Sequence, residues 1–209
     1  MQQLARKQLA RTQVLLAAVV GLMPMAAQAA PLTVVNVSAP AINCVFTTAA
    51  PCTVTVNDTV GAIPVVGGRL QSRTYKGAPG SAASGLTAYV YRVDLTSAVG
   101  ITAIDCIDRM AVKFARLESL DFNGDRRREQ VFVVTGGGLG TIGLASADKT
   151  GDTVTFRFRS PVCQGSAPGR GATSFFFGVV ARPQPQNVRA TLHSSLTGAS
   201  HVVAARSAP

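Results

Sequence analysis

One nine-residue stretch of the chain, residues 121–129, carries side-chain oxygens at a spacing that suits a metal ion. It reads Asp-Phe-Asn-Gly-Asp-Arg-Arg-Arg-Glu. Its oxygen-bearing side chains occupy positions 1, 3, 5 and 9: Asp121, Asn123, Asp125 and Glu129. Calcium takes about six to eight oxygen ligands, and a tight loop with alternating oxygens can wrap around it. The spacing therefore predicts a Ca²⁺ site with these four side chains as ligands.

This stretch resembles the Asp-x-Asp/Asn-x-Asp-Gly-x-x-Asp loop of integrin-type propeller repeats, and its start resembles EF-hand and dockerin loops. The resemblance implies calcium as a cofactor, and it covers these nine residues alone. Arg126 stands where the pattern has Gly, Glu129 replaces Asp, and Phe132 stands where an EF-hand has its bidentate Glu. The alternative is a polar turn whose Asp and Asn side chains bond to nearby backbone N–H groups and pair with Arg126–Arg128.

Hydrolytic chemistry has fewer candidate residues. His193 and His201 are the two histidines, and the sequence contains no Gly-x-Ser-x-Gly motif. Catalytic triads assemble in space, so either histidine could still meet Asp94, Asp105 or Asp108. No spacing marks such a site, and the chain is therefore interpreted as non-catalytic, with a secreted hydrolase as the alternative.

The three tyrosines are candidates for stacking on a sugar ring. Tyr89 and Tyr91 lie two residues apart on a predicted strand, so their rings share one side of it, as stacking requires. Tyr75 is the third. Tyr89 and Tyr91 are the predicted ligand-binding pair, and packing in the core is the alternative use of the same pattern.

Four cysteines predict two disulfide bonds. An even number of cysteines is typical of disulfide bonding in an exported chain. The chain has no Cys-x-x-Cys motif that would indicate a metal site. Of the three possible connectivities, we expect the one that joins the nearest pair in sequence and leaves the distant pair to each other: Cys44–Cys52 and Cys106–Cys163.

The N-terminal residues 1–29 have the order of a secretory signal peptide. Basic residues (Arg6, Lys7, Arg11) precede a short apolar run, and Ala27-Gln28-Ala29 fits the cleavage rule. We expect cleavage after Ala29 and a single domain at 30–209, located in the periplasm or outside the cell. No later segment approaches the about 20 apolar residues of a membrane-spanning helix, so no transmembrane anchor is predicted.

The charge of the expected mature chain is positive. Residues 1–29 carry three basic and no acidic residues, which leaves 17 Lys and Arg against 10 Asp and Glu, a net charge of +7. This charge admits an anionic partner, with a glycan or another cell-surface component as the candidate class, but the favoured interpretation is that it serves solubility. The basic residues are spread along the chain and aromatic residues make up 6%, which does not favour nucleic acid.

The elements that must position these groups are strands. After residue 29 apolar residues alternate with period two, and Gly, Pro, Asn or Asp interrupt the alternation about every ten residues. The predicted strands are 32–37, 42–47, 52–57, 69–75, 86–95, 101–104, 111–117, 130–135, 153–159, 174–181, 188–193 and 201–205. Strands 111–117 and 130–135 are expected to form a hairpin that holds the 121–129 loop.

Eleven or twelve strands exceed a comfortable single sheet, so the sequence predicts an all-β, antiparallel β-sandwich held by disulfides. We interpret the chain as an exported, non-catalytic surface, matrix or ligand-binding module, with calcium as its candidate cofactor. Besides the hydrolase, a cationic binder of anionic glycans is an alternative.

Overall fold

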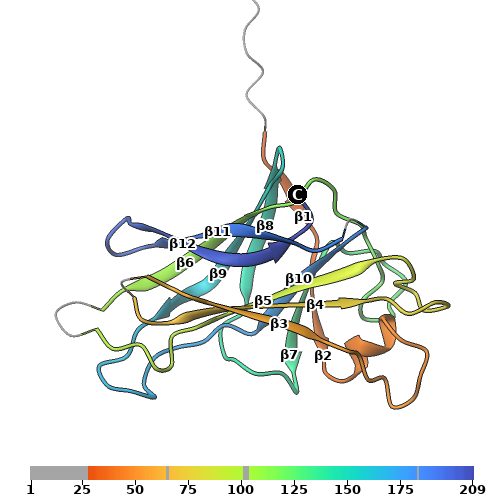
Figure 1. Ribbon diagram of the computed structural model, residues 1–209, viewed down its shortest axis with the longest axis horizontal. Helices are drawn as coiled ribbons and strands as arrows, with labels where there is room; N and C mark the ends of the chain where they lie inside the picture. The colour runs from red at the N-terminus through yellow and green to blue at the C-terminus, as the bar shows by residue number, and fades with distance from the viewer. Residues whose placement is uncertain (1–27, 65, 101–103, 183) are drawn as a thin grey trace, which may run out of the picture.

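The computed structural model describes residues 28–64, 66–100, 104–182 and 184–209. Nearly all of the predicted signal peptide, and most of the predicted strand 101–104, lie outside these ranges. Two six-stranded sheets face each other (Figure 1), which confirms the predicted sandwich and its strand number. A short 3-10 helix, η1 (Ala41–Val45), lies between the second and third strands.

The two sheets draw their strands from all parts of the chain. Sheet A has the order β1 (Ala30–Leu32), β8 (Leu144–Thr150), β9 (Thr153–Cys163), β6 (Cys106–Lys113), β11 (Gln186–Ser194) and β12 (Ser200–Ser207). Sheet B has the order β2 (Val34–Ser38), β7 (Val131–Gly136), β10 (Phe176–Ala181), β5 (Thr87–Asp94), β4 (Arg69–Lys76) and β3 (Asn57–Ala62).

One pairing departs from the antiparallel arrangement of the rest of the sandwich. Strand β2 runs parallel to β7, whereas the other neighbouring strands pair antiparallel. Only Thr33 separates β1, at the edge of sheet A, from β2, at the edge of sheet B. Because the N-terminal segment passes from sheet to sheet without reversing direction, its second half meets β7 in parallel.

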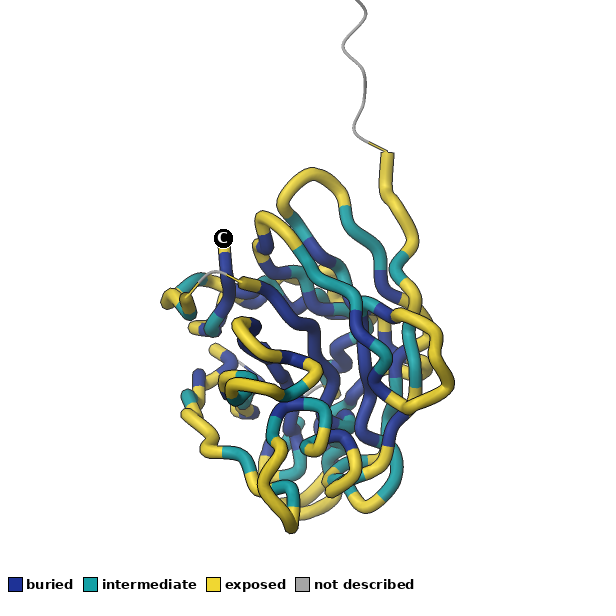
Figure 2. The backbone as a smooth tube through the Cα atoms, turned by 90° about the vertical axis from the view of Figure 1, so that its right-hand side faces the viewer, coloured by how far each residue is buried: buried dark blue, intermediate teal, exposed yellow. Residues whose placement is uncertain are grey.

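The main core lies between the sheets and follows the alternation in the sequence. Val154, Phe156 and Phe158 point into it from β9, while Arg157 and Arg159 are exposed. Burial of apolar side chains is the main favourable term in folding, at about 25 cal/mol per Å². Figure 2 shows these buried segments running through the middle of the molecule, with exposed loops around them.

A second apolar cluster covers the outer face of sheet B. Phe132, Val134 and Phe176 point outward from the sheet, yet each is less than 9% exposed. Residues of η1, of the 77–86 loop and of the 114–130 segment pack over them. This third layer explains why the run 131–134 is apolar at every position, as expected for a strand buried on both faces.

The predicted hairpin around the 121–129 loop is wrong. Strand β6 belongs to sheet A and β7 to sheet B, so residues 114–130 cross from one sheet to the other. The predicted strand 42–47 is largely the helix η1, and 52–57 lies mostly in a turn and irregular backbone that lead into β3. Strand β8 was not predicted.

Both predicted disulfides are present. Cys44 and Cys52 close the loop that follows η1, and Cys106 and Cys163 join the paired strands β6 and β9. Among the described residues, no helix is long and apolar enough to cross a membrane.

Candidate ligand-binding pocket

The oxygens of the 121–129 loop accept hydrogen bonds from the loop's own backbone. Asp121 accepts from the N–H of Gly124 at 2.6 Å and of Arg126 at 2.8 Å, and Asp125 accepts from Arg127 at 2.8 Å. The pKa of Asp125 is lowered, first by the hydrogen bond from the N–H of Arg127 and then by one from the Asn123 side-chain amide. Locally the loop is a series of Asx turns.

Glu129 differs from the other three predicted calcium ligands. It is 3% exposed, and its Oε2 accepts from the N–H of Phe122 at 3.2 Å. Within the described ranges, no three His, Cys, Asp or Glu side chains gather as a set that could hold a metal ion. Arg126 has a φ of +68°, the turn for which cation loops use Gly at position six. Calcium binding at this loop stays a prediction.

The structure corrects the interpretation of Tyr89 and Tyr91. Both rings are 0% exposed and pack between the sheets, Tyr89 against Phe114 at 5.3 Å and Tyr91 against Phe177 at 6.0 Å between centroids. Burial raises the pKa of Tyr89 to about 12, which nearby Arg206 partly offsets. A sugar cannot reach either ring, so neither is a stacking residue.

The histidines lie beside carboxylates, but the geometry differs from a catalytic triad. His201 Nε2 is 3.1 Å from Asp105 Oδ2, and the Ser194 hydroxyl donates to the other oxygen of the same carboxylate. Ser194 is 0% exposed. The serine hydroxyl is therefore bound to the carboxylate and not to the histidine, whereas a catalytic triad places the histidine between the two.

A cavity of about 390 Å³ lies between sheet B and the layer that covers it. One wall is the outer face of the sheet, with Val90, Val134 and Phe176. The opposite wall is η1, which contributes Ile42, and the disulfide-closed Cys44–Cys52 loop with the residues directly after it, among them Val54. Cavities of this size and apolar character are typical of small-molecule sites.

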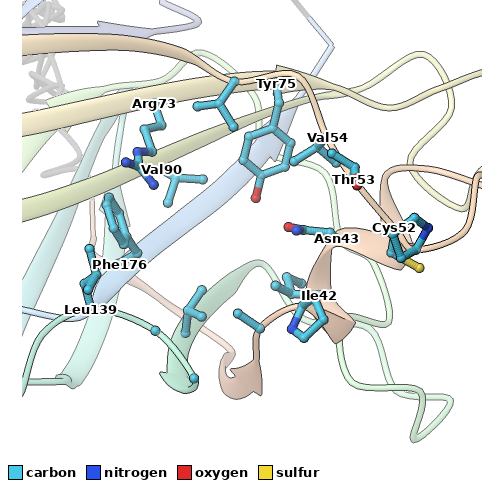
Figure 3. Close-up of a pocket in the computed structure, with 17 residues that line it drawn as sticks. Ile42, Asn43, Cys52, Thr53, Val54, Arg73, Tyr75, Val90, Leu139 and Phe176 are labelled. Carbon is cyan, nitrogen blue, oxygen red and sulfur yellow. The ribbon is translucent and has the colours of Figure 1, made fainter.

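Two polar side chains point into the middle of this cavity (Figure 3). Tyr75 is 7% exposed, and its ring is held edge-on against Phe46 at 4.8 Å between centroids. Within the described part of the chain, neither the Tyr75 hydroxyl nor the Asn43 amide has a hydrogen-bond partner. Burial raises the pKa of Tyr75 well above its ordinary value, so the hydroxyl keeps its proton and can donate.

The sheet side of the cavity ends at Arg73. Its guanidinium carbon lies 4.3 Å from the centroid of the Phe176 ring, a cation–π contact, and its Nε donates to Asp58 Oδ1 at 2.8 Å. Arg92 lies over the same ring at 5.1 Å. Burial lowers the pKa of Arg92, which Asp94 partly offsets, and its Nε has no hydrogen-bond partner in the described residues.

Sequence reasoning missed this site because its residues are far apart in the chain. Asn43 lies in η1, Arg73 and Tyr75 lie in β4, and Phe176 lies in β10. The one local signal is that Arg73 and Tyr75 alternate on a strand and so share a face. Nothing in the sequence shows that a disulfide loop covers that face.

Comparison of the chain with protein-family models, with curated proteins and with solved structures found no match. A function is therefore proposed from the geometry of the molecule alone.

Proposed function

We propose that this protein is an exported, non-catalytic module that binds a small apolar ligand in the cavity between η1 and sheet B. The observation that carries the proposal is the Tyr75 hydroxyl. Tyr75 as a residue is 7% exposed, and its hydroxyl has no hydrogen-bond partner among the described residues and points into an apolar cavity beside the Asn43 side-chain amide. The hydroxyl is therefore available to donate a hydrogen bond to a ligand oxygen in the cavity.

Export is supported by three observations. Two disulfides, which form in oxidising compartments, join all four cysteines. Residues 1–29 have the composition of a signal peptide. Strand β1 begins at Ala30, so the expected cleavage after Ala29 leaves both sheets intact.

The absence of tryptophan from the chain gives a direct test. Val56 is 39% exposed on the rim of the cavity, and Val202 is 41% exposed on β12 of sheet A. Val56→Trp and Val202→Trp each introduce a single indole with nearly equal exposure. We expect 1-decanol to shift the emission of Val56→Trp with a saturable concentration dependence and to leave Val202→Trp unchanged.

Equal responses of the two variants, or no saturable response to 1-decanol or decanoate at Val56→Trp, would contradict the proposal. An equal response would mean that the alcohol adsorbs to the surface without a specific site.

A further inference from the structure

The cavity has a charged end and an apolar end. None of the 17 residues that line it is Asp or Glu, and Arg73 is the single cation among them. Beyond Arg73, aliphatic side chains from the sheet and from the covering loop continue the lining: Ile42, Val54, Val90 and Val134. A ligand that matches both ends has one negative charge and an aliphatic body.

Arg73 has donors to spare for such a charge. Its Nε binds Asp58, whereas its two Nη groups make no hydrogen bond to any described residue. The Phe176 ring beneath it holds the guanidinium in place. An arginine offers paired donors that match a carboxylate, and a partner held by stacking loses less entropy on binding.

The surrounding charges leave an excess of positive charge at this end. Arg69 and Arg92 both pair with Asp94, at 2.7 and 3.0 Å, and Arg73 pairs with Asp58. Three guanidinium groups therefore face two carboxylates. Arg92 is 9% exposed, so part of this charge is poorly solvated, and an anion bound at Arg73 would compensate the excess.

Tyr75 lies on the same side of β4 as Arg73, two residues along the strand, which places their Cα atoms about 6.6 Å apart. Its hydroxyl and the Nη groups of Arg73 can donate to one carboxylate, whose two oxygens each accept hydrogen bonds. We infer that the ligand is a free aliphatic monocarboxylic acid, its carboxylate bound by Arg73 and Tyr75 and its chain lying along Val90 toward Ile42. This inference rests on the proposed function and specifies its ligand class.

The test compares three ten-carbon probes by calorimetry: decanoate, 1-decanol and decyltrimethylammonium. A charge-assisted hydrogen bond contributes enough to change affinity about tenfold or more. We expect decanoate to bind at least about tenfold more tightly than 1-decanol, and the ammonium to bind more weakly than both. Arg73→Gln should remove the preference for decanoate over 1-decanol.

Two further variants complete the design. Arg157→Gln is the matched control, because Arg157 is also a strand arginine whose Nε pairs with an aspartate, Asp148 at 3.5 Å, but on sheet A. It should keep the preference. Asp58→Asn removes the negative charge that competes with the ligand for Arg73 and should strengthen decanoate binding.

The possible failures are distinguishable. Equal affinities for decanoate and 1-decanol, a preference for the ammonium, or a preference that survives Arg73→Gln would overturn the carboxylate inference and leave the pocket intact. If no probe binds and the Val56→Trp emission does not respond, the proposed function is overturned as well.

Discussion

The hydroxyl of Tyr91 donates a hydrogen bond to the carbonyl oxygen of Arg206 at 2.5 Å, and this bond joins the two sheets. Tyr91 belongs to β5 of sheet B, and Arg206 belongs to β12, the edge strand of sheet A. The N–H of Arg206 in turn donates to Ser72 Oγ of sheet B at 3.0 Å. Side chains of sheet B therefore bind the backbone of the β12 edge, which would otherwise present unpaired groups.

This contact predicts a stability difference between two tyrosines. Tyr91→Phe leaves a carbonyl without its donor, so we expect unfolding to become easier by about 1–3 kcal/mol. Tyr75→Phe removes a hydroxyl that has no partner among the described residues and should change stability by less than about 0.5 kcal/mol. Urea unfolding of both variants checks this. Equal losses would contradict a contribution of the bond between Tyr91 and Arg206 to stability.

The two disulfides should contribute unequally. The chain-entropy relation gives about 2.6 kcal/mol for the loop closed by Cys44–Cys52 and about 4.2 kcal/mol for that closed by Cys106–Cys163. Alanine pairs at each bond, compared by denaturant unfolding, measure the difference. Because Cys52 lines the cavity, losing the first bond should also abolish the Val56→Trp response at a temperature where the fold persists.

Asp94 predicts a dependence of stability on acid. Burial alone would raise its pKa, but hydrogen bonds from Thr96 and Arg69 outweigh it and hold the pKa below the ordinary value of 3.8. The folded state therefore favours the ionised form. The contribution of Asp94 to the stability of the fold is present above the unfolded-state pKa and is lost as the pH falls through the lower folded-state pKa.

Asp94→Asn tests this dependence. The variant leaves Arg92 buried without its anion, and we expect it to lose about 3 kcal/mol at pH 7. The difference in unfolding free energy between the variant and the wild type should narrow below about pH 4, because the wild-type carboxyl then becomes protonated. Thermal unfolding between pH 2 and 7 measures this stability difference. A difference that stays constant with pH would contradict the role of the ionised Asp94.

Calcium at the 121–129 loop is tested by melting temperature. The loop would supply up to three carboxylates beside three arginines, so we expect weak affinity, with a Kd on the order of 1 mM. At about 10 mM calcium, linkage would stabilise the fold by roughly 1.4 kcal/mol, a shift of about 2–4 °C. The double variant Asp121→Ala, Asp125→Ala should lose the shift. No shift relative to a magnesium control would identify the loop as a polar turn.

Export is checked on protein from the native host. N-terminal sequencing should begin at Ala30, the first residue of β1. Soluble cytoplasmic protein that retains Met1 would contradict the signal-peptide assignment.

Strands with strong alternation were predictable, and the cover of sheet B was not. Phe176 and Phe177 point to opposite faces of β10, as the alternation of side chains along a strand predicts. The 52–57 stretch also alternates Thr with Val, yet Cys52 adopts a φ of +62° in the turn closed by its disulfide. There a covalent constraint outweighs β propensity. Strand β8 escaped prediction because Leu144 and Ala147 are its only buried residues.

The candidate site was less predictable than the fold. Tyr75 was grouped with Tyr89 and Tyr91 as an aromatic residue, but burial inside the sandwich removes the latter two from any ligand. Whether a tyrosine faces the core or an outer cavity depends on which face of its strand the neighbouring sheet covers. That is a property of the assembled layers, and no local spacing encodes it.

The passage of the N-terminal segment from sheet A to sheet B has a consequence for the order in which the chain can fold. Ala30 pairs with Lys149 and Val34 pairs with Val131. In a chain that is delivered N-terminus first, the first strands must wait for partners about one hundred residues behind them. Neither sheet can acquire this edge until two-thirds of the chain has emerged, so a chaperone that shields residues 30–38 would act during that interval.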